Sequence, residues 1–161
     1  VGAQLIVGTS GRNALSGGVG DDTIRGGNGD DTLSGGDDAD LLIAGAGDDE
    51  IEGGAGRDRM RGNAGEDIFV FGDITDSAGA AAQADVILDF VSGEDQLDLS
   101  GIGNLVFIGT DPFDGKVGDV RLDVLPSGNG RLQIDTNGDN VADSQITLVG
   151  VGSLTSVDLI L

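Results

Sequence analysis

Large apolar residues recur every nine positions through the first 70 residues and predict a stack of short strands. They are Leu15, Ile24, Leu33, Leu42, Ile51, Met60 and Phe69. Each is the eighth residue of a nine-residue block and has mostly polar neighbours. This alternation of polar and apolar residues is typical of a strand with one face turned inward. We therefore predict that the last three residues of each block form a strand and the first six form a tight turn.

Glycine and aspartate fill the predicted turns in the same phase. From Gly17 the blocks read GGVGDDTIR, GGNGDDTLS, GGDDADLLI, AGAGDDEIE, GGAGRDRMR and GNAGEDIFV, and GTSGRNALS precedes them. Glycine permits positive φ values and close backbone approach; Asp38, Ala44 and Asn63 replace it. Two blocks complete one coil of about 18 residues, so alternate blocks stack as neighbouring strands. A flexible acidic linker would not keep this phase.

Stacking places the carboxylates at position six above one another. They belong to Asp22, Asp31, Asp40, Asp49, Asp58 and Asp67, and Asn13 occupies the same slot upstream as a weaker ligand. Two carboxylates about 5 Å apart repel by about 3 kcal/mol at an effective dielectric constant near 20, so the coil needs a cation to fold. Ca²⁺ prefers carboxylate and carbonyl oxygens, and we expect about four to six ions. The predicted carbonyl ligands come from Gly18, Gly20, Gly27, Gly29, Gly36, Gly45, Gly47, Gly54 and Gly56.

Composition removes most other functions. Eight basic and 29 acidic residues give a net charge of −21, which excludes a general binder of nucleic acid or anionic membranes. The chain has no Cys and no His, so disulfides, Cys/His zinc sites and imidazole catalysis are excluded. No apolar run is long enough to span a membrane. A glycosidase that uses two carboxylates is compatible, but no acid/base pair stands apart from the calcium pattern, and we expect no enzyme.

The repeats resemble a known family. The pattern GGxGxDxUx, in which U is large and apolar, is that of RTX proteins. Residues 65–102 resemble the segment after the repeats in serralysin-type metalloproteases and in modules of mannuronan C5-epimerases. The resemblance implies an all-β fold: a right-handed parallel β-roll that binds Ca²⁺ along both edges. We expect the roll over residues 1–70, and a cap of antiparallel strands and loops over residues 71–161 that shares its core.

The C-terminal half changes to a period of two. Apolar and polar residues alternate over 120–124 and 132–135, which predicts antiparallel strands joined by a turn at 126–130. The sequence DTNGDNVAD begins like a calcium loop, with Asp135, Asn137 and Asp139 as ligands. It lacks the later Gly and Glu of that loop, and a hairpin with an Asn-Gly turn explains it equally well. Both interpretations remain open.

These observations favour a non-catalytic, calcium-dependent folding and secretion module of a larger extracellular bacterial protein. The final SVDLIL resembles the uncleaved signal read by type I secretion machinery, although an amphipathic last strand fits it equally well. The expected partners are calcium, that machinery and an upstream domain of the parent protein. We expect a secreted monomer.

An alternative function is binding of an anionic polysaccharide such as alginate, as in the epimerase modules that the sequence resembles. Arg25, Arg57, Arg59 and Arg61 all fall in one alternate set of repeats and hence on one side of the roll. Arginine pairs well with carboxylates. The plainer interpretation is that these arginines keep the surface soluble.

Overall fold

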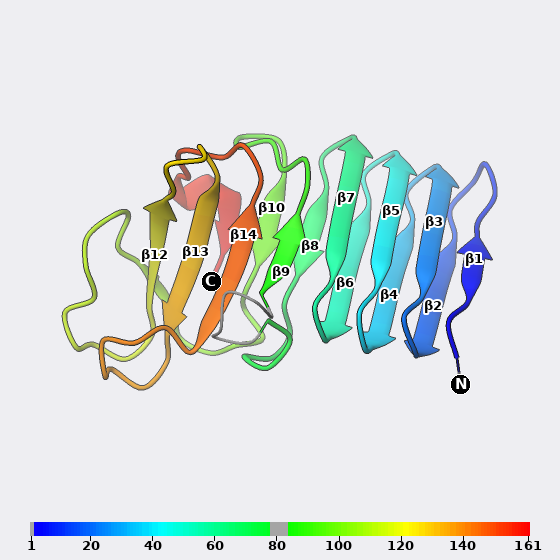
Figure 1. Cartoon of the computed structure of the whole chain (residues 1–161). Coiled ribbons are helices and arrows are strands. Elements are labelled where there is room, and N and C mark those ends of the chain that lie inside the picture. The colour runs from blue at the N-terminus through cyan, green and yellow to red at the C-terminus, as the bar shows by residue number, and fades with distance from the viewer. Residues whose placement is uncertain (1, 78–83) are drawn as a thin grey trace.

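The protein consists almost entirely of β-strands. The computed structural model describes residues 2–77 and 84–161, so part of the stretch 65–102 lies outside the described residues. The strands lie side by side along an elongated molecule, from β1 (Leu5–Val7) at one end to β12 (Asp119–Val124) near the other (Figure 1). Within the described residues, the one helical element is the 3-10 turn η1 (Ser156–Asp158). The all-β class is confirmed.

The repeats form two parallel sheets that alternate along the chain. One sheet contains β1, β3 (Thr23–Asn28), β5 (Leu41–Ala46) and β7 (Arg59–Ala64); the other contains β2 (Ala14–Val19), β4 (Thr32–Asp37), β6 (Glu50–Ala55) and β8 (Ile68–Val70). Paired residues are 18 apart, as in Leu15 with Leu33 and Ile24 with Leu42. The predicted stacking of alternate blocks into a parallel β-roll is confirmed, whereas its right-handedness stays a prediction.

The strands are longer than the pattern predicted. Each complete strand of the roll has six residues, because it continues through the first three residues of the following block, of which the second and third are paired. Gly18, for example, pairs with Gly36 in the same register as the apolar residues before it. The turn therefore shrinks to positions four, five and six of each block.

Glycine has the predicted role in stacking. Gly36 and Gly45 have φ values of 115° and 135°. A Cβ on Gly36 would lie 2.1 Å from the Gly18 carbonyl oxygen, so a side chain would separate the coils. Asp38 and Asn63 adopt φ values of 80° and 73° in place of glycine, in keeping with the tolerance of Asp and Asn for this region.

The cap extends both sheets. In the larger sheet, β9 (Asp85–Ile87) pairs in parallel with β7 and β14 (Ser144–Leu148). There β13 (Gly130–Asp135) pairs antiparallel with β12 and β14, which confirms the predicted antiparallel strands, and β11 (Val106–Phe107) ends the sheet. In the smaller sheet, β10 (Gln96–Asp98) and β15 (Leu159–Ile160) follow β8 in parallel. The cap therefore contains both parallel and antiparallel strand pairs. A domain division at residue 70 stays a prediction.

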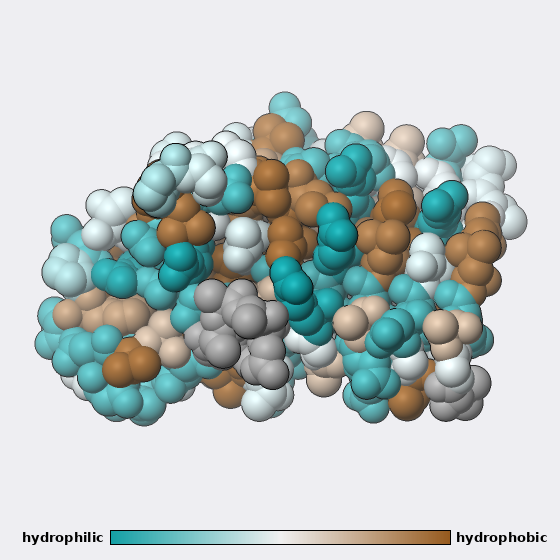
Figure 2. Space-filling model, in the orientation of Figure 1, coloured by the Kyte–Doolittle hydropathy of each residue, from teal (hydrophilic) through white to brown (hydrophobic). Residues whose placement is uncertain are grey.

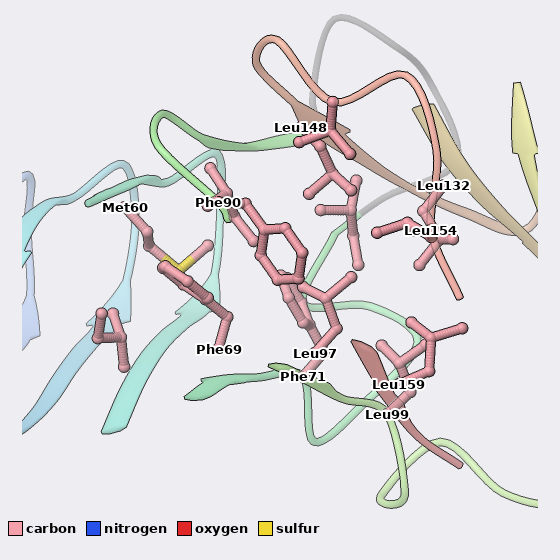
Figure 3. Packing of buried hydrophobic residues seen from close by; sticks show 14 of the residues in the cluster. Met60, Phe69, Phe71, Phe90, Leu97, Leu99, Leu132, Leu148, Leu154 and Leu159 are labelled. Atoms are coloured by element: carbon pink, nitrogen blue, oxygen red, sulfur yellow. The ribbon is translucent and has the colours of Figure 1, made fainter. Parts of the chain in front are cut away.

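The apolar residues at position eight form the core between the sheets. Those from Ile24 to Phe69 are at most 1% exposed, whereas Leu15 is only partly buried because β2 is the last strand of its sheet. Phe69 and Phe90 approach with ring centroids 6.1 Å apart, where the roll meets the cap (Figure 3). One hydrophobic cluster runs from the roll into the cap.

Candidate metal centre along the roll edges

The turns before the strands form two edges of the roll. The first edge, before the strands of the larger sheet, carries Asp22, Asp40 and Asp58; the second edge, before those of the smaller sheet, carries Asn13, Asp31, Asp49 and Asp67. All six aspartates are buried, with at most 3% of their surface exposed. The structure thus gathers the predicted carboxylates into one row on each edge.

Each aspartate uses one oxygen to bind the neighbouring coil. The Asp22 amide donates to Asp40 Oδ1 at 2.6 Å, and the Asp40 amide donates to Asp58 Oδ1 at 2.8 Å. On the second edge the Asp31 amide donates to Asp49 Oδ1 at 2.7 Å. The other oxygen, Oδ2, is buried without a hydrogen-bond partner in all five of these aspartates. An unpartnered buried carboxylate oxygen is costly, so these oxygens are the natural ligands of a cation.

Where the first residue of a block is glycine, it leaves room beside that oxygen; Ala44 is the one alanine at this position. A Cβ on Gly35 would lie 2.3 Å from Asp40 Oδ2 and 2.4 Å from the carbonyl oxygen of Gly53. A Cβ on Gly26 would lie 2.4 Å from Asp31 Oδ2 and 2.6 Å from the carbonyl oxygen of Ala44. A carboxylate from one coil and a carbonyl from the next therefore face one small space, and hard cations such as Ca²⁺ bind both groups.

These carbonyls were missed by the sequence analysis, which selected glycines at positions two and four. The selected glycines have positive φ values. The carbonyl oxygens of Gly18 and Gly27 face the equivalent glycines of the next coil, since Cβ atoms there would lie 2.1 Å and 1.9 Å away. Their role as ligands stays a prediction. Only the three-dimensional stack reveals that the carbonyl at position one lies beside the carboxylate.

Burial and charge repulsion make these carboxylates hard to ionise. Burial raises the pKa of Asp40 and Asp49 to about 6, the amide bonds oppose the rise, and the stacked carboxylates of Asp22 and Asp31 add to it. Burial likewise raises the pKa of Asp58 and Asp67 to about 7. The rows therefore favour a proton or a cation on the carboxylates.

Two further aspartates extend the rows into the cap. The Asp58 amide donates to Asp85 Oδ1 at 2.7 Å, and the Asp67 amide donates to Asp95 Oδ1 at 3.1 Å. Burial raises the pKa of Asp85 to about 8, although the hydrogen bond from the Asp58 amide opposes the rise. No complete nonapeptide surrounds these residues. The available signal at Asp95 was the second half of the pattern, Gly93-Glu94-Asp95-Gln96-Leu97, and at Asp85 it was an aspartate at the start of a short alternating strand.

The site depends on backbone oxygens as well as side chains. In the part of the chain that the structure describes, no three acidic side chains gather closely enough to hold a metal ion by themselves. A ligand set of one carboxylate per coil plus carbonyls suits Ca²⁺, which binds several oxygens in flexible geometry. The donor set therefore fits this ion, and its chemistry there would be to neutralise and join successive coils.

The loop at Asp135 is held by its own hydrogen bonds. Asp135 is fully buried, and it accepts the Gly138 amide on Oδ1 at 2.6 Å and the Asn140 amide on Oδ2 at 2.9 Å. Asn137 Oδ1 accepts the Asp139 amide at 2.9 Å. These bonds support the interpretation as a turn between β13 and β14. An ion at this loop stays a prediction.

The arginines lie on the first-edge side of the molecule. Arg25, Arg59 and Arg61 are exposed on the larger sheet, Arg57 lies in the turn before β7, and Arg61 approaches Asp89 at 3.9 Å. Arg57 and Arg59 share a groove of about 760 Å³, which Arg25 does not line. The other lining residues are Asp21, Asp22, Thr23, Ala39, Asp40, Leu41, Val86, Leu88 and Val149. Hydrophobic and hydrophilic residues intermix on the face shown in Figure 2.

Parallel coils of 18 residues with a carboxylate row on each edge define an RTX-type β-roll module. A family model described as Peptidase M10 serralysin C terminal matches residues 6–161. The chain therefore belongs to the serralysin C-terminal family, as its repeats and the stretch 65–102 indicated.

Curated relatives include two proteases. The chain is 41% identical over 93 residues to metallopeptidase AprA of Pseudomonas marginalis, and 39% identical over 95 residues to metalloprotease AprA of Pseudomonas entomophila strain L48. Each match covers 55% of this chain and 19% of the relative. The chain thus corresponds to a small part of these proteases. This similarity supports a calcium-binding repeat module.

Solved structures with the same architecture include two modules of an epimerase. The AlgE6R3 subunit of the Azotobacter vinelandii mannuronan C5-epimerase matches with a TM-score of 0.58 and 25% identity, over 99% of this chain and 78% of that one. The AlgE6R2 subunit matches with a TM-score of 0.57 and 30% identity, over 97% and 91%. No helix among the described residues is long and apolar enough to cross a membrane.

Proposed function

We propose that this chain is a calcium-dependent folding and secretion module of a larger extracellular bacterial protein and has no catalytic activity of its own. The observation that carries the proposal is the pair of buried rows. Each aspartate accepts an amide of the preceding coil on Oδ1, and Asp22, Asp31, Asp40, Asp49 and Asp58 keep Oδ2 unpartnered. Where a site does not exist in the unfolded chain, the binding free energy contributes directly to folding.

The rows of buried carboxylates make folding depend on the calcium concentration. Without cations, carboxylates in stacked turns repel one another and are buried at a cost. At the low calcium concentration inside a cell, the chain stays unfolded and can be threaded through a type I secretion channel. At about millimolar calcium outside, ions joining successive coils favour the roll, because extracellular modules bind Ca²⁺ in that range.

The C-terminal segment is the proposed export signal. It ends in SVDLIL, and Leu159 pairs with Leu97 when the chain is folded. An unfolded chain leaves this segment accessible to the secretion machinery, and folding after export occupies it. A module that is joined to an upstream domain agrees with the small share of each protease relative that the chain matches.

The number of calcium ions bound by a variant that lacks one carboxylate of a row tests the proposal. Asp40→Asn changes a carboxylate that accepts the Asp22 amide and whose own amide donates to Asp58, and Asp111→Asn is an exposed control. Titration calorimetry should show fewer ions bound by Asp40→Asn and an unchanged number for the control. The proposal is wrong if wild type binds no calcium, or if Asp40→Asn binds as many ions as wild type.

A second candidate function is binding of a polyuronate such as alginate. The observation in its favour is the groove of about 760 Å³ that brings Arg57 and Arg59 together beside apolar side chains. Calcium-loaded wild type should bind alginate oligomers, and Arg57→Ala with Arg59→Ala should weaken binding while Arg12→Ala, on the other edge, should not. Absence of binding by folded wild type rules this function out.

A further inference from the structure

The two edges differ in the residues just outside the buried aspartates. On the second edge, position five of successive coils holds Arg12, Asp30, Asp48 and Glu66, and Glu94 precedes Asp95 in the same way. On the first edge the equivalent residues are Asp21, Ala39, Arg57 and Ala84. Asp21 and Arg57 cancel in charge, whereas Arg12 offsets only one of four carboxylates. We call Asp30, Asp48, Glu66 and Glu94 the outer acidic row.

The outer acidic row is linked from coil to coil as far as Glu66. The Asp48 amide donates to Asp30 Oδ1 at 3.2 Å, and the Glu66 amide donates to Asp48 Oδ1 at 2.9 Å. On the first edge the Ala39 amide donates to Asp21 Oδ1 at 3.2 Å, and the row stops there because Ala39 has no carboxylate. Only the second edge thus continues its outer carboxylates from coil to coil.

Two hollows that share lining residues bring the outer row beside the buried aspartates. The first, of about 260 Å³, is lined by Asp30, Asp48 and Glu66 together with Asp31 and Asp49, and Arg12 is the basic residue among its lining. Asp31 and Asp49 are each 2% exposed and keep an unpartnered Oδ2. The next hollow, of about 360 Å³, shares Asp48 and Glu66 and is lined by the cap residues Glu94 and Asp95 as well. The groove on the first edge contains two arginines, Arg57 and Arg59, beside Asp21, Asp22 and Asp40.

We propose that the outer acidic row makes the second edge the high-affinity calcium edge, which fills first and empties last. This inference rests on the proposed function and adds an order to it. Each edge carries four buried aspartates. Only the second edge continues carboxylates from coil to coil at position five, so the proposed difference comes from the charge at that position. Calcium affinity rises with the number of charged ligands and neighbours. Exposed charges act through solvent and salt, so we expect a difference of about tenfold in the midpoint concentration of free calcium.

Nuclear magnetic resonance of the calcium-loaded chain in a series of chelator-buffered calcium concentrations tests the order. The amides of Asp22 and Asp40 report the first edge, and those of Asp31 and Asp49 report the second edge, since each donates to a row carboxylate. As free calcium falls, the first-edge amides should change at about tenfold higher free calcium than the second-edge amides. The inference is wrong if both pairs change together, or if the second edge changes first.

Charge variants identify the cause. Asp48→Asn combined with Glu66→Gln should reduce the gap between edges to about threefold or less, and Arg57→Gln should reduce it by tightening the first edge. Glu52→Gln is the matched control, because Glu52 points outward from β6 away from the turns and should leave the gap unchanged. A gap that persists in the double variant overturns the role of the outer row. Failure of wild type to take up calcium would instead overturn the proposed function.

Discussion

At the scale of the residue, each buried aspartate has two separate tasks. Asp40 Oδ1 accepts the Asp22 amide and joins two coils, while Asp40 Oδ2 faces the space beside Gly35. Asparagine would keep the first contact and lose the negative charge of the second. Glycine at position one of that block leaves the space open, whereas Ala44 stands at position one of the next block. This role differs from the positive φ found at the glycines of positions two and four.

Gly35→Ala tests the role of that space. The new Cβ would lie within 3 Å of Asp40 Oδ2 and of the Gly53 carbonyl oxygen, which is closer than atoms pack without strain. We expect the calcium-loaded form to lose about 1–3 kcal/mol of unfolding free energy, and the calcium midpoint to rise. Denaturant unfolding at fixed calcium measures the first effect. Gly152→Ala is the control, because a Cβ there meets nothing within 4 Å; equal stability of the two variants contradicts this account.

The sequence predicted the rows of the roll but not their full extent. The nine-residue phase identified Asp22 through Asp67 because identical blocks fold identically. Asp85 and Asp95 were missed because they continue the rows after the repeat has ended, across a segment of different length. Stacking depends on which strand pairs with which, and outside a periodic segment that pairing is decided by three-dimensional packing.

At the scale of the element, hydrogen bonds of Asp158 hold the last strand, β15, at the end of the second edge. Asp158, fully buried, accepts the amides of Thr155 at 2.6 Å and Gly93 at 2.7 Å and the hydroxyl of Ser92 at 2.9 Å. Burial raises the pKa of Asp158, but these bonds outweigh it and the pKa is lowered. The residues bound by Asp158 adjoin Asp95, which ends the second row, so the docking of β15 is tied to that edge.

Asp158→Ala should loosen the C-terminal strand. The change leaves buried donors without an acceptor, and we expect a loss of about 1–3 kcal/mol in unfolding free energy. Hydrogen exchange should quicken at the amides of β10 and β15 more than in the strands of the roll. Asp111→Ala, at an exposed site, should leave exchange unchanged. Uniform loss of protection across all strands would contradict a local fastening.

At the scale of the whole molecule, net charge opposes folding and cations relieve it. Residues 1–70 contain 14 acidic and five basic residues, which leaves nine negative charges. Four Ca²⁺ ions would nearly neutralise them. Protons are the other cation available to the buried rows, so acid and calcium should act on the same groups.

Acid should stabilise the metal-free roll. The folded-state pKa values of Asp58 and Asp67, about 7, and of Asp85, about 8, lie above the ordinary value of 3.8. Groups with raised pKa values contribute stability below the ordinary value and lose it as the pH rises through the folded value. With a chelator present, circular dichroism should therefore show more β-structure at pH 5 than at pH 8. The calcium concentration at the folding midpoint should rise as the pH is lowered from 8 to 5, because protons compete with calcium for the same oxygens. A metal-free chain that loses β-structure on acidification contradicts both expectations.

Calcium titration of the metal-free chain at pH 8, followed by far-ultraviolet circular dichroism with Mg²⁺ as the control cation, tests the central claim most directly. Mg²⁺ is smaller and demands stricter geometry, so it should not replace Ca²⁺. The account predicts a change from coil to β-structure that is complete at about millimolar calcium, and little change with magnesium. A chelator-treated chain that already has its full β spectrum, and does not respond to calcium, would contradict it.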